Sequence, residues 1–174
     1  HRDGTKADWG FSCLIEGTEK TILFDTGTHP GILMHNVDAL GVDLKKVDQI
    51  VLSHEHDDHV GGLFEVLKWN PDAAVFYPVS FQAPLALRLE RLKPKAQAVD
   101  APLEICRGVH LTGEMGGRIK EQSLIIDAPG GLVIVAGCSH QGIVNILRRA
   151  KDIRDRPIDL VFGGFHLGDA SDAE

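Results

Sequence analysis

The chain has 174 residues, of which 43% are hydrophobic and 25% are charged, as is usual for one soluble globular domain with its own core. The formal net charge is −7, and the absence of a basic stripe argues against a nucleic-acid-binding surface. The sequence contains no apolar run long enough to span a bilayer, which argues against a membrane partner.

The cysteines indicate the cellular compartment, and the first residue indicates whether the domain is complete. Cys13, Cys106 and Cys138 are an odd number at wide spacing, so we expect no disulfide framework and a cytoplasmic location. We expect Cys13 and Cys106 to behave as small core hydrophobes. The chain begins at His1 rather than Met, so we expect a single domain over residues 1–174 that is incomplete at its amino end.

The first predicted elements are a hairpin, a helix and a buried strand. The β-rich runs 11–16 and 21–24 are separated by a four-residue turn and predict the hairpin. Residues 32–40 predict a helix that Gly41 closes. Residues 47–53 contain a short apolar run of the buried-strand type.

The middle of the chain is less regular. Residues 63–67 suit the apolar face of a helix, 73–77 predict a strand and 84–92 predict a second helix. Within the poorly patterned stretch 94–123, the segment 109–111 is the one predicted strand.

The last part of the chain predicts two strands, 124–126 and 132–135, on either side of a Pro-Gly-Gly turn. A helix over 143–150 and a strand over 158–162 follow. We interpret the basic run that begins near the end of this helix as an exposed surface. Its members are Arg148, Arg149, Lys151, Arg154 and Arg156.

Four predicted strands end in a small-residue turn that carries a potential ligand. Loops at strand ends are where α/β scaffolds place their chemistry. The residues at these four ends are Asp25, His54, Cys138 with His140, and His166.

The densest cluster is His54, His56, Asp58 and His59, directly after the buried strand. Imidazole and carboxylate are ligands that zinc, iron and manganese accept. In a locally extended segment, His54 and His56 point the same way and could reach one cation, while Asp58 and His59 follow a turn and could reach a second. Two cations about 3.5–4 Å apart can clamp both ends of a displacement reaction. A solvated polar loop is the weaker interpretation, because protonated histidines this close would repel one another.

The segment His54-x-His56-x-Asp58-His59 resembles the HxHxDH signature of the metallo-β-lactamase superfamily. Further segments occur in the expected order and together resemble a subgroup of metal-dependent hydrolases related to a dihydropterin-ribofuranosyl-aminobenzene phosphate synthase. These segments are Leu23-Phe24-Asp25-Thr26-Gly27, Leu52-Ser53-His54, Gly61-Gly62-Leu63, Gly137-Cys138-Ser139-His140, Gly142-Ile143-Val144-Asn145 and Gly163-Gly164-Phe165-His166-Leu167.

The resemblance implies an α/β fold, a four-layer αβ/βα sandwich with the metals at one edge of the two sheets. It implies that His54 and His56 bind a first metal and that Asp58 and His59 bind a second. Asp58 and His59 are also the candidate catalytic residues. Asp25 matches an aspartate that does not touch the metal but orients the metal-binding loop, since ligating histidines need their other nitrogen held.

Two departures from the superfamily pattern concern the second half of the chain. Cys138 stands where a bridging aspartate is usual, so it is either a thiolate ligand or a buried, inert thiol. The usual separate histidine before this strand is missing, and Glu121-Gln122-Ser123 occupies that region. We therefore assign the missing imidazole to His140.

His166 has two interpretations. Related sequences continue past this segment to another histidine motif, so we expect the domain to be incomplete at its carboxyl end as well. His166 is then either a metal ligand or an imidazole that lines the cleft. His29 could face substrate but is better explained as a solvated loop residue. The remaining histidines, His1, His35 and His110, are expected to be structural.

The predicted function is a metal-dependent hydrolase in which a metal-bound hydroxide attacks a small ester or a phosphate-containing metabolite. The expected cofactor is one or two zinc ions, with iron or manganese as alternatives, and the expected partner is a small-molecule substrate. Two other functions stay open: iron-dependent redox or oxygen chemistry on the same fold, and a non-catalytic metal-binding module. The oligomeric state stays open too.

Overall fold

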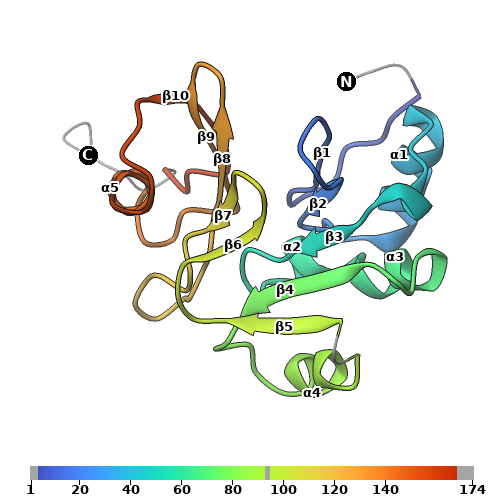
Figure 1. Cartoon of the computed structure of the whole chain (residues 1–174). Helices are drawn as coiled ribbons and strands as arrows, with labels where there is room; N and C mark the ends of the chain where they lie inside the picture. Colours follow the sequence, from blue (N-terminus) through green and yellow to red (C-terminus); the bar gives the residue numbers. More distant parts are fainter. Residues whose placement is uncertain (1–3, 93–94, 168–174) are drawn as a thin grey trace. The chain divides into compact units, whose positions relative to one another are not determined.

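The computed structural model describes residues 4–92 and 95–167, and these divide into two compact units (Figure 1). Residues 4–77, 81–92 and 95–98 form the first unit, and residues 78–80 and 99–167 form the second. Each unit is built on one five-stranded sheet.

The sheet of the first unit has the spatial order β1-β2-β3-β4-β5. Its strands are β1 (Cys13–Ile15), β2 (Ile22–Phe24), β3 (Gln49–Val51), β4 (Ala74–Pro78) and β5 (Ala96–Val99). Strands β1 and β2 pair antiparallel, which confirms the predicted hairpin, whereas β3 pairs parallel with both β2 and β4. The carboxyl ends of β2 and β3 therefore meet at one edge of the sheet, and Asp25 and His54 follow there.

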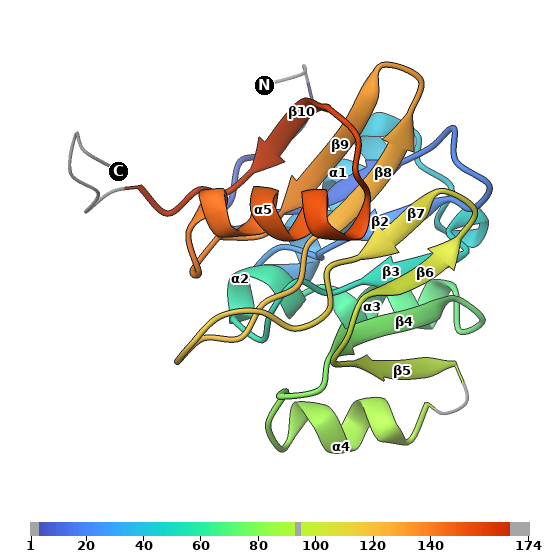
Figure 2. The same ribbon diagram turned by 60° about the vertical axis from the view of Figure 1, so that its left-hand side comes forward.

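The helical segments of the first unit supply the other half of its core. They are α1 (Pro30–Leu40), the 3₁₀ turn η1 (Leu44–Lys46), α2 (Asp57–Val60), α3 (Leu63–Trp69) and α4 (Leu85–Glu90). Leu63 and Val66 of α3 pack with Ile50 and Val75 of the sheet, and Figure 2 shows α3 lying along β3 and β4. Gly41 ends α1 in the left-handed conformation with φ 68°, as predicted, because glycine adopts this region without strain.

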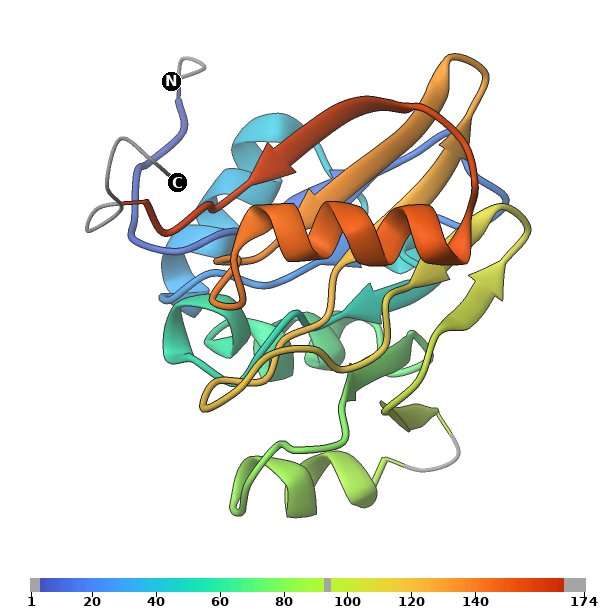
Figure 3. The same ribbon diagram turned by 90° about the vertical axis from the view of Figure 1, so that its left-hand side faces the viewer.

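The sheet of the second unit has the order β10-β9-β8-β7-β6, with β10 parallel to β9 and the other pairs antiparallel. Its strands are β6 (Leu103–Cys106), β7 (Val109–Leu111), β8 (Leu124–Ala128), β9 (Gly131–Ala136) and β10 (Ile158–Gly163). Helix α5 (Ile143–Ile153) connects the parallel pair and lies across one face of the sheet (Figure 3). Its buried residues Ile146 and Ala150 pack on Ile125 and Ile134.

The basic run is not simply a solvated surface. Arg154 and Arg156 both form ion pairs with Asp127, with N–O distances of 2.7 and 3.2 Å. The Nε–H of Arg149 donates to the carbonyl oxygen of Thr112 at 3.1 Å. These contacts attach α5 and the chain that follows it to the sheet, so the prediction of an exposed run was wrong for three of its five members.

Two parts of the secondary structure differ from the prediction. Strands β5 and β6 lie in the stretch 94–123, where Gln97 and Glu104 interrupt any apolar run, so no strand was predicted for them. The predicted turn after His56 is one turn of helix, because α2 begins at Asp57. Two acidic residues in its first turn favour a helix by complementing its dipole.

Among the helices of residues 4–92 and 95–167, there is none with the length and apolarity needed to cross a bilayer.

Candidate metal centre

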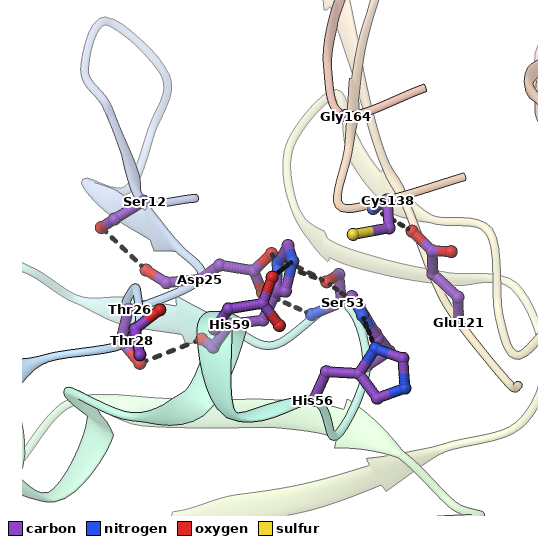
Figure 4. Close-up of polar contacts among 12 residues, drawn as sticks. Ser12, Asp25, Thr26, Thr28, Ser53, His56, His59, Glu121, Cys138 and Gly164 are labelled. Carbon is purple, nitrogen blue, oxygen red and sulfur yellow. Dashed lines mark hydrogen bonds and ion pairs between the residues drawn. The ribbon is translucent and has the colours of Figure 1, made fainter. Parts of the chain in front are cut away.

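The residue that organises the first unit's cluster is Asp25, which follows β2 and is fully buried. Its oxygen Oδ1 accepts a hydrogen bond from the Ser53 backbone N–H at 2.7 Å. Its oxygen Oδ2 accepts from the Ser53 hydroxyl at 2.7 Å and lies 2.7 Å from Nδ1 of His59 (Figure 4). One carboxylate therefore contacts both the segment that precedes the histidine cluster and the last histidine within it.

The protonation of Asp25 reflects two opposing influences. Complete burial raises the pKa of its carboxyl above the ordinary value, because desolvation penalises the charged form. The contact with His59 and the hydrogen bonds from Ser53 lower the pKa and offset this only in part. The ionised form of Asp25 is therefore stabilised by its contacts with Ser53 and His59, and the same contacts hold those two residues in place.

The same network engages Nδ1 of two imidazole rings, and an ionised Asp25 would place the hydrogens as follows. A carboxylate only accepts hydrogen bonds, so Nδ1 of His59 carries the hydrogen that it donates to Asp25. The Ser53 hydroxyl gives its one hydrogen to Asp25, and it must therefore accept from Nδ1 of His54, 2.8 Å away. The network thus engages Nδ1 of each ring and leaves Nε2 as the atom through which a neutral ring would ligate a metal.

Two pairs of candidate ligand atoms in this cluster lie at the spacing that ligands of a cation have. Nε2 of His54 lies 3.1 Å from Nδ1 of His56, and two ligand nitrogens in a tetrahedral zinc site are about 3.3 Å apart. Nε2 of His59 lies 3.4 Å from Oδ2 of Asp58. The ring centroids of His54 and His59 are 4.2 Å apart. The pair His54–His56 and the pair Asp58–His59 thus each have the spacing of two ligands of one cation.

The short helix α2 is held by the loop that follows Asp25. The Thr26 backbone N–H and hydroxyl both donate to the carbonyl oxygen of His59, at 2.7 and 3.0 Å. The Gly61 N–H donates to the carbonyl oxygen of Gly27 at 2.9 Å, and a Cβ at position 61 would overlap the Thr28 carbonyl group. The glycine after the histidine cluster is therefore required by this close backbone approach.

The second unit gathers a different set of candidate ligands. One ligand atom each of Cys138, His140 and His166 lie within 4.8 Å of one another. The rings of His140 and His166 have centroids 4.6 Å apart. The Gly164 N–H donates to the Gly137 carbonyl oxygen at 2.8 Å, which joins the carboxyl ends of β9 and β10. Cys138 is partly exposed, which favours the ligand interpretation over a buried, inert thiol.

A pocket of about 580 Å³ adjoins this second set. His140 and His166 line it together with Arg148, Phe165 and the first turn of α5. It combines a cationic side chain with the amino end of a helix, and both favour an anionic ligand.

The predicted residues fall into two groups, one in each unit. In the first unit, His59 contacts Asp25, Asp58 and His54, and His54 contacts His56. The structure brings Cys138, His140 and His166 together in the second unit. His29 is exposed and caps α1, since its Nδ1 accepts the Gly31 N–H at 3.1 Å, so it has a local structural task.

Sequence reasoning missed two residues in these clusters. Ser53 links Asp25 to His54, and its position between a buried strand and the histidine cluster was the available signal. Glu121 is fully buried and accepts hydrogen bonds from the backbone of Cys138, Ser139 and His140, as Figure 4 shows for Cys138. Its partners lie 17–19 residues away in the sequence, so no local pattern could reveal them.

Histidines and carboxylates at the ends of parallel strands define the class, an α/β protein with a candidate metal centre. A family model described as the metallo-beta-lactamase superfamily matches residues 10–137. A 7,8-dihydropterin-6-methyl-4-(beta-D-ribofuranosyl)-aminobenzene-5'-phosphate synthase from Methanocaldococcus jannaschii is 31% identical, over 92% of this chain and 71% of its own. The chain belongs to the metallo-β-lactamase superfamily, which confirms the resemblance seen in the sequence.

Solved structures agree on the fold. The crystal structure of Tm1679, a metal-dependent hydrolase of the β-lactamase superfamily, aligns with a TM-score of 0.76 at 27% identity, over 99% of this chain and 75% of that one. An N-acyl homoserine lactone hydrolase aligns with a TM-score of 0.59 at 19% identity, over 87% of this chain and 77% of its own, and supports the fold alone. The fold is of the metallo-β-lactamase type.

Proposed function

We propose that this protein is a metal-dependent hydrolase that acts on a small ester or phosphate-containing metabolite. Zinc is the first choice of cofactor, as one or two ions, with iron and manganese as the alternatives. The proposed ligands are His54, His56, Asp58, His59, Cys138, His140 and His166. The observation that carries the proposal is the Asp25–Ser53 network, because it engages Nδ1 of the two most buried imidazoles of the cluster and leaves their Nε2 atoms to bind a cation.

The residues divide the chemical work. When bound, the cation supplies an acidified water and a Lewis acid for the substrate oxygen. His54 and His56 hold it, and Asp25 keeps the His59 ring oriented through Nδ1. Asp58 and His59 are the proposed catalytic residues as well as ligands, and the carboxylate oxygen of Asp58 that does not hold the cation would take the proton of the water.

The substrate class rests on the relatives and on the second unit's pocket. The Methanocaldococcus jannaschii relative is a synthase whose named product carries a 5'-phosphate. Arg148 and the first turn of α5 line the pocket beside His140 and His166, an arrangement suited to a phosphate group. We do not propose hydrolysis of antibiotic lactams, because a shared fold does not transfer an activity. A small-molecule partner and a cytoplasmic location are parts of the proposal.

The direct test is elemental analysis of unchelated protein, a zinc competition titration, and an assay against generic phosphodiesters and esters. The His56→Ala variant should lose turnover and bind zinc more weakly. The matched control is His35→Ala, because His35 is a histidine whose Nε2 contacts the Gly4 carbonyl oxygen away from the cluster. Full activity in His56→Ala would contradict the proposal.

The same experiment separates the alternatives. Stoichiometric iron with visible absorption would favour redox or oxygen chemistry. Metal binding without turnover of any substrate would favour a non-catalytic metal-binding module.

A further inference from the structure

Glu121 lies in the loop before β8, and its side chain is directed at the turn that follows β9. Its Oε1 accepts the backbone N–H groups of Cys138 and Ser139 at 2.9 and 3.0 Å. Its Oε2 accepts the N–H of His140 at 2.9 Å. Glu121 is itself fixed by a two-way backbone pairing with Met115, at 2.8 and 2.9 Å. One carboxylate thus contacts three consecutive amides.

Burial makes these contacts decisive. Glu121 has no exposed surface, and a buried carboxylate is tolerated only where strong hydrogen bonds replace its hydration. Three successive N–H groups converge on one anion because Ser139 adopts the left-handed conformation with φ 63°. Backbone concavities of this kind bind anions, and here the protein supplies the anion itself.

The turn that Glu121 holds contains two of the second unit's candidate ligands. Cys138 and His140 flank Ser139, so the path of the backbone through Ser139 sets the direction of both side chains. The Ser139 hydroxyl also donates to the carbonyl oxygen of Gly164 at 2.7 Å, two residues before His166. A change in the turn would therefore move the cysteine and the histidine together.

We propose that Glu121 is a positioning residue that holds the Cys138–His140 turn in the conformation that presents the Cys138 sulfur and the His140 imidazole to a cation. It acts through backbone amides and does not contact the cation. This inference rests on the proposed metal-binding function, but the amide contacts can be tested without metal.

The test compares Glu121→Gln with Glu104→Gln in metal-free and zinc-loaded protein. Glu104 is an exposed glutamate that accepts the Gly108 N–H at 2.9 Å in the β6–β7 turn, so its variant removes the same charge elsewhere in this unit. Amide hydrogen exchange is measured by NMR, and zinc affinity is measured by competition with a chelator.

Glutamine keeps one acceptor oxygen and turns an N–H₂ donor towards an amide N–H. We expect exchange at residues 138–140 to accelerate by about tenfold or more in metal-free Glu121→Gln. Zinc affinity should fall by about 10- to 100-fold, as for other residues that orient ligands. Exchange at Ile125 and Ile134 should stay unchanged, which separates positioning from general destabilisation.

Unchanged exchange at residues 138–140 in Glu121→Gln would overturn the inference, and so would accelerated exchange with unchanged zinc affinity. If the variant does not fold, hydrogen exchange in the wild-type protein still tests the inference. Amides at residues 138–140 that exchange without protection would exclude their hydrogen bonds to the Glu121 carboxylate. Failure of the wild type to bind zinc would instead contradict the proposed function, while the exchange data would still test the contact.

Discussion

The two units each bury one carboxylate beside their candidate ligands, but the two carboxylates act on different parts of the chain. In the first unit, Asp25 accepts hydrogen bonds from one backbone amide, one hydroxyl and one imidazole nitrogen. In the second unit, Glu121 accepts three backbone amides. Asp25 therefore sets the tautomer and direction of side chains, whereas Glu121 sets the path of the backbone.

This difference predicts how each cluster tolerates change. Loss of Asp25 leaves an imidazole free to rotate and to move its hydrogen to Nε2, which removes a ligating lone pair. Loss of Glu121 leaves the ring chemistry of His140 intact and changes only where the ring lies. We therefore expect loss of Asp25 to have a larger effect than loss of Glu121.

The largest effect is expected for Asp25→Ala. It leaves three donors in the buried cluster unmatched, so the free energy of unfolding should fall by about 3–5 kcal/mol. Zinc affinity should fall by about 100-fold, because the His59 ring is no longer held. Denaturant unfolding and chelator competition measure the two quantities.

The matched control is Asp127→Ala, which removes the partner of Arg154 and Arg156 in the second unit. It should lower stability by less, because those arginines are partly exposed, and it should leave zinc affinity unchanged. Equal losses of zinc affinity in the two variants would contradict a specific role for Asp25.

The next effect is expected for Ser53→Ala, which keeps Asp25 and removes the link to His54. The unfolding free energy should fall by about 1–3 kcal/mol, because Nδ1 of His54 loses its acceptor. Zinc affinity should fall by roughly tenfold, at the lower end of the range for residues that orient ligands. Ser12→Ala is the control, since the Ser12 hydroxyl contacts the Asp25 backbone carbonyl rather than its carboxylate. An equal effect of both variants on zinc affinity would contradict the role of the Ser53 hydroxyl as the link between Asp25 and His54.

A smaller effect is expected for Cys138→Ser, which tests whether this thiol is a ligand. In cobalt-substituted protein, a thiolate-to-metal charge-transfer band should be present in the wild type and absent from the variant. Cys13→Ser is the control, because burial raises the pKa of the Cys13 thiol and disfavours its thiolate form. A charge-transfer band that persists in Cys138→Ser would show that Cys138 is not a metal ligand.

The smallest effect is expected for Arg148→Ala in the second unit's pocket. The KM for a phosphorylated substrate should rise by roughly fivefold, which corresponds to about 1 kcal/mol for an exposed ion pair. The KM for a neutral ester should not change. Lys151→Ala removes a charge from the same helix outside the pocket and should change neither value. A uniform rise for both substrates would contradict recognition of an anion.

Much of the first unit could be predicted because its signals are local. The hairpin, the buried strand β3 and the histidine cluster are contiguous runs, and Asp25 follows an apolar strand directly. The sequence also showed the glycines after the cluster, although not that position 61 must accommodate the Thr28 carbonyl. The sequence did not indicate the role of Ser53, whose hydroxyl contacts both the Asp25 carboxylate and the His54 ring.

The second unit was harder to predict, because its organisation depends on contacts between distant residues. Glu121 accepts hydrogen bonds from the backbone of a turn, which no sequence motif marks. Strands β5 and β6 contain polar residues that interrupt the apolar pattern of a strand. Arg154 and Arg156 were predicted to be solvated, since a run of cations carries no local sign of the Asp127 carboxylate that pairs with them. Strands β8 to β10 were predictable because each contains a contiguous apolar run, and α5 was predictable because its apolar residues recur at helical spacing.

The most direct test of the metal centre is long-range ¹H–¹⁵N NMR of the histidine rings before and after addition of zinc. We expect metal-free protein to carry hydrogen on Nδ1 of His54 and His59 and none on Nε2, and zinc to shift the Nε2 resonances of both rings. Hydrogen on Nε2 of both rings, or Nε2 resonances that do not respond to zinc, would contradict the account.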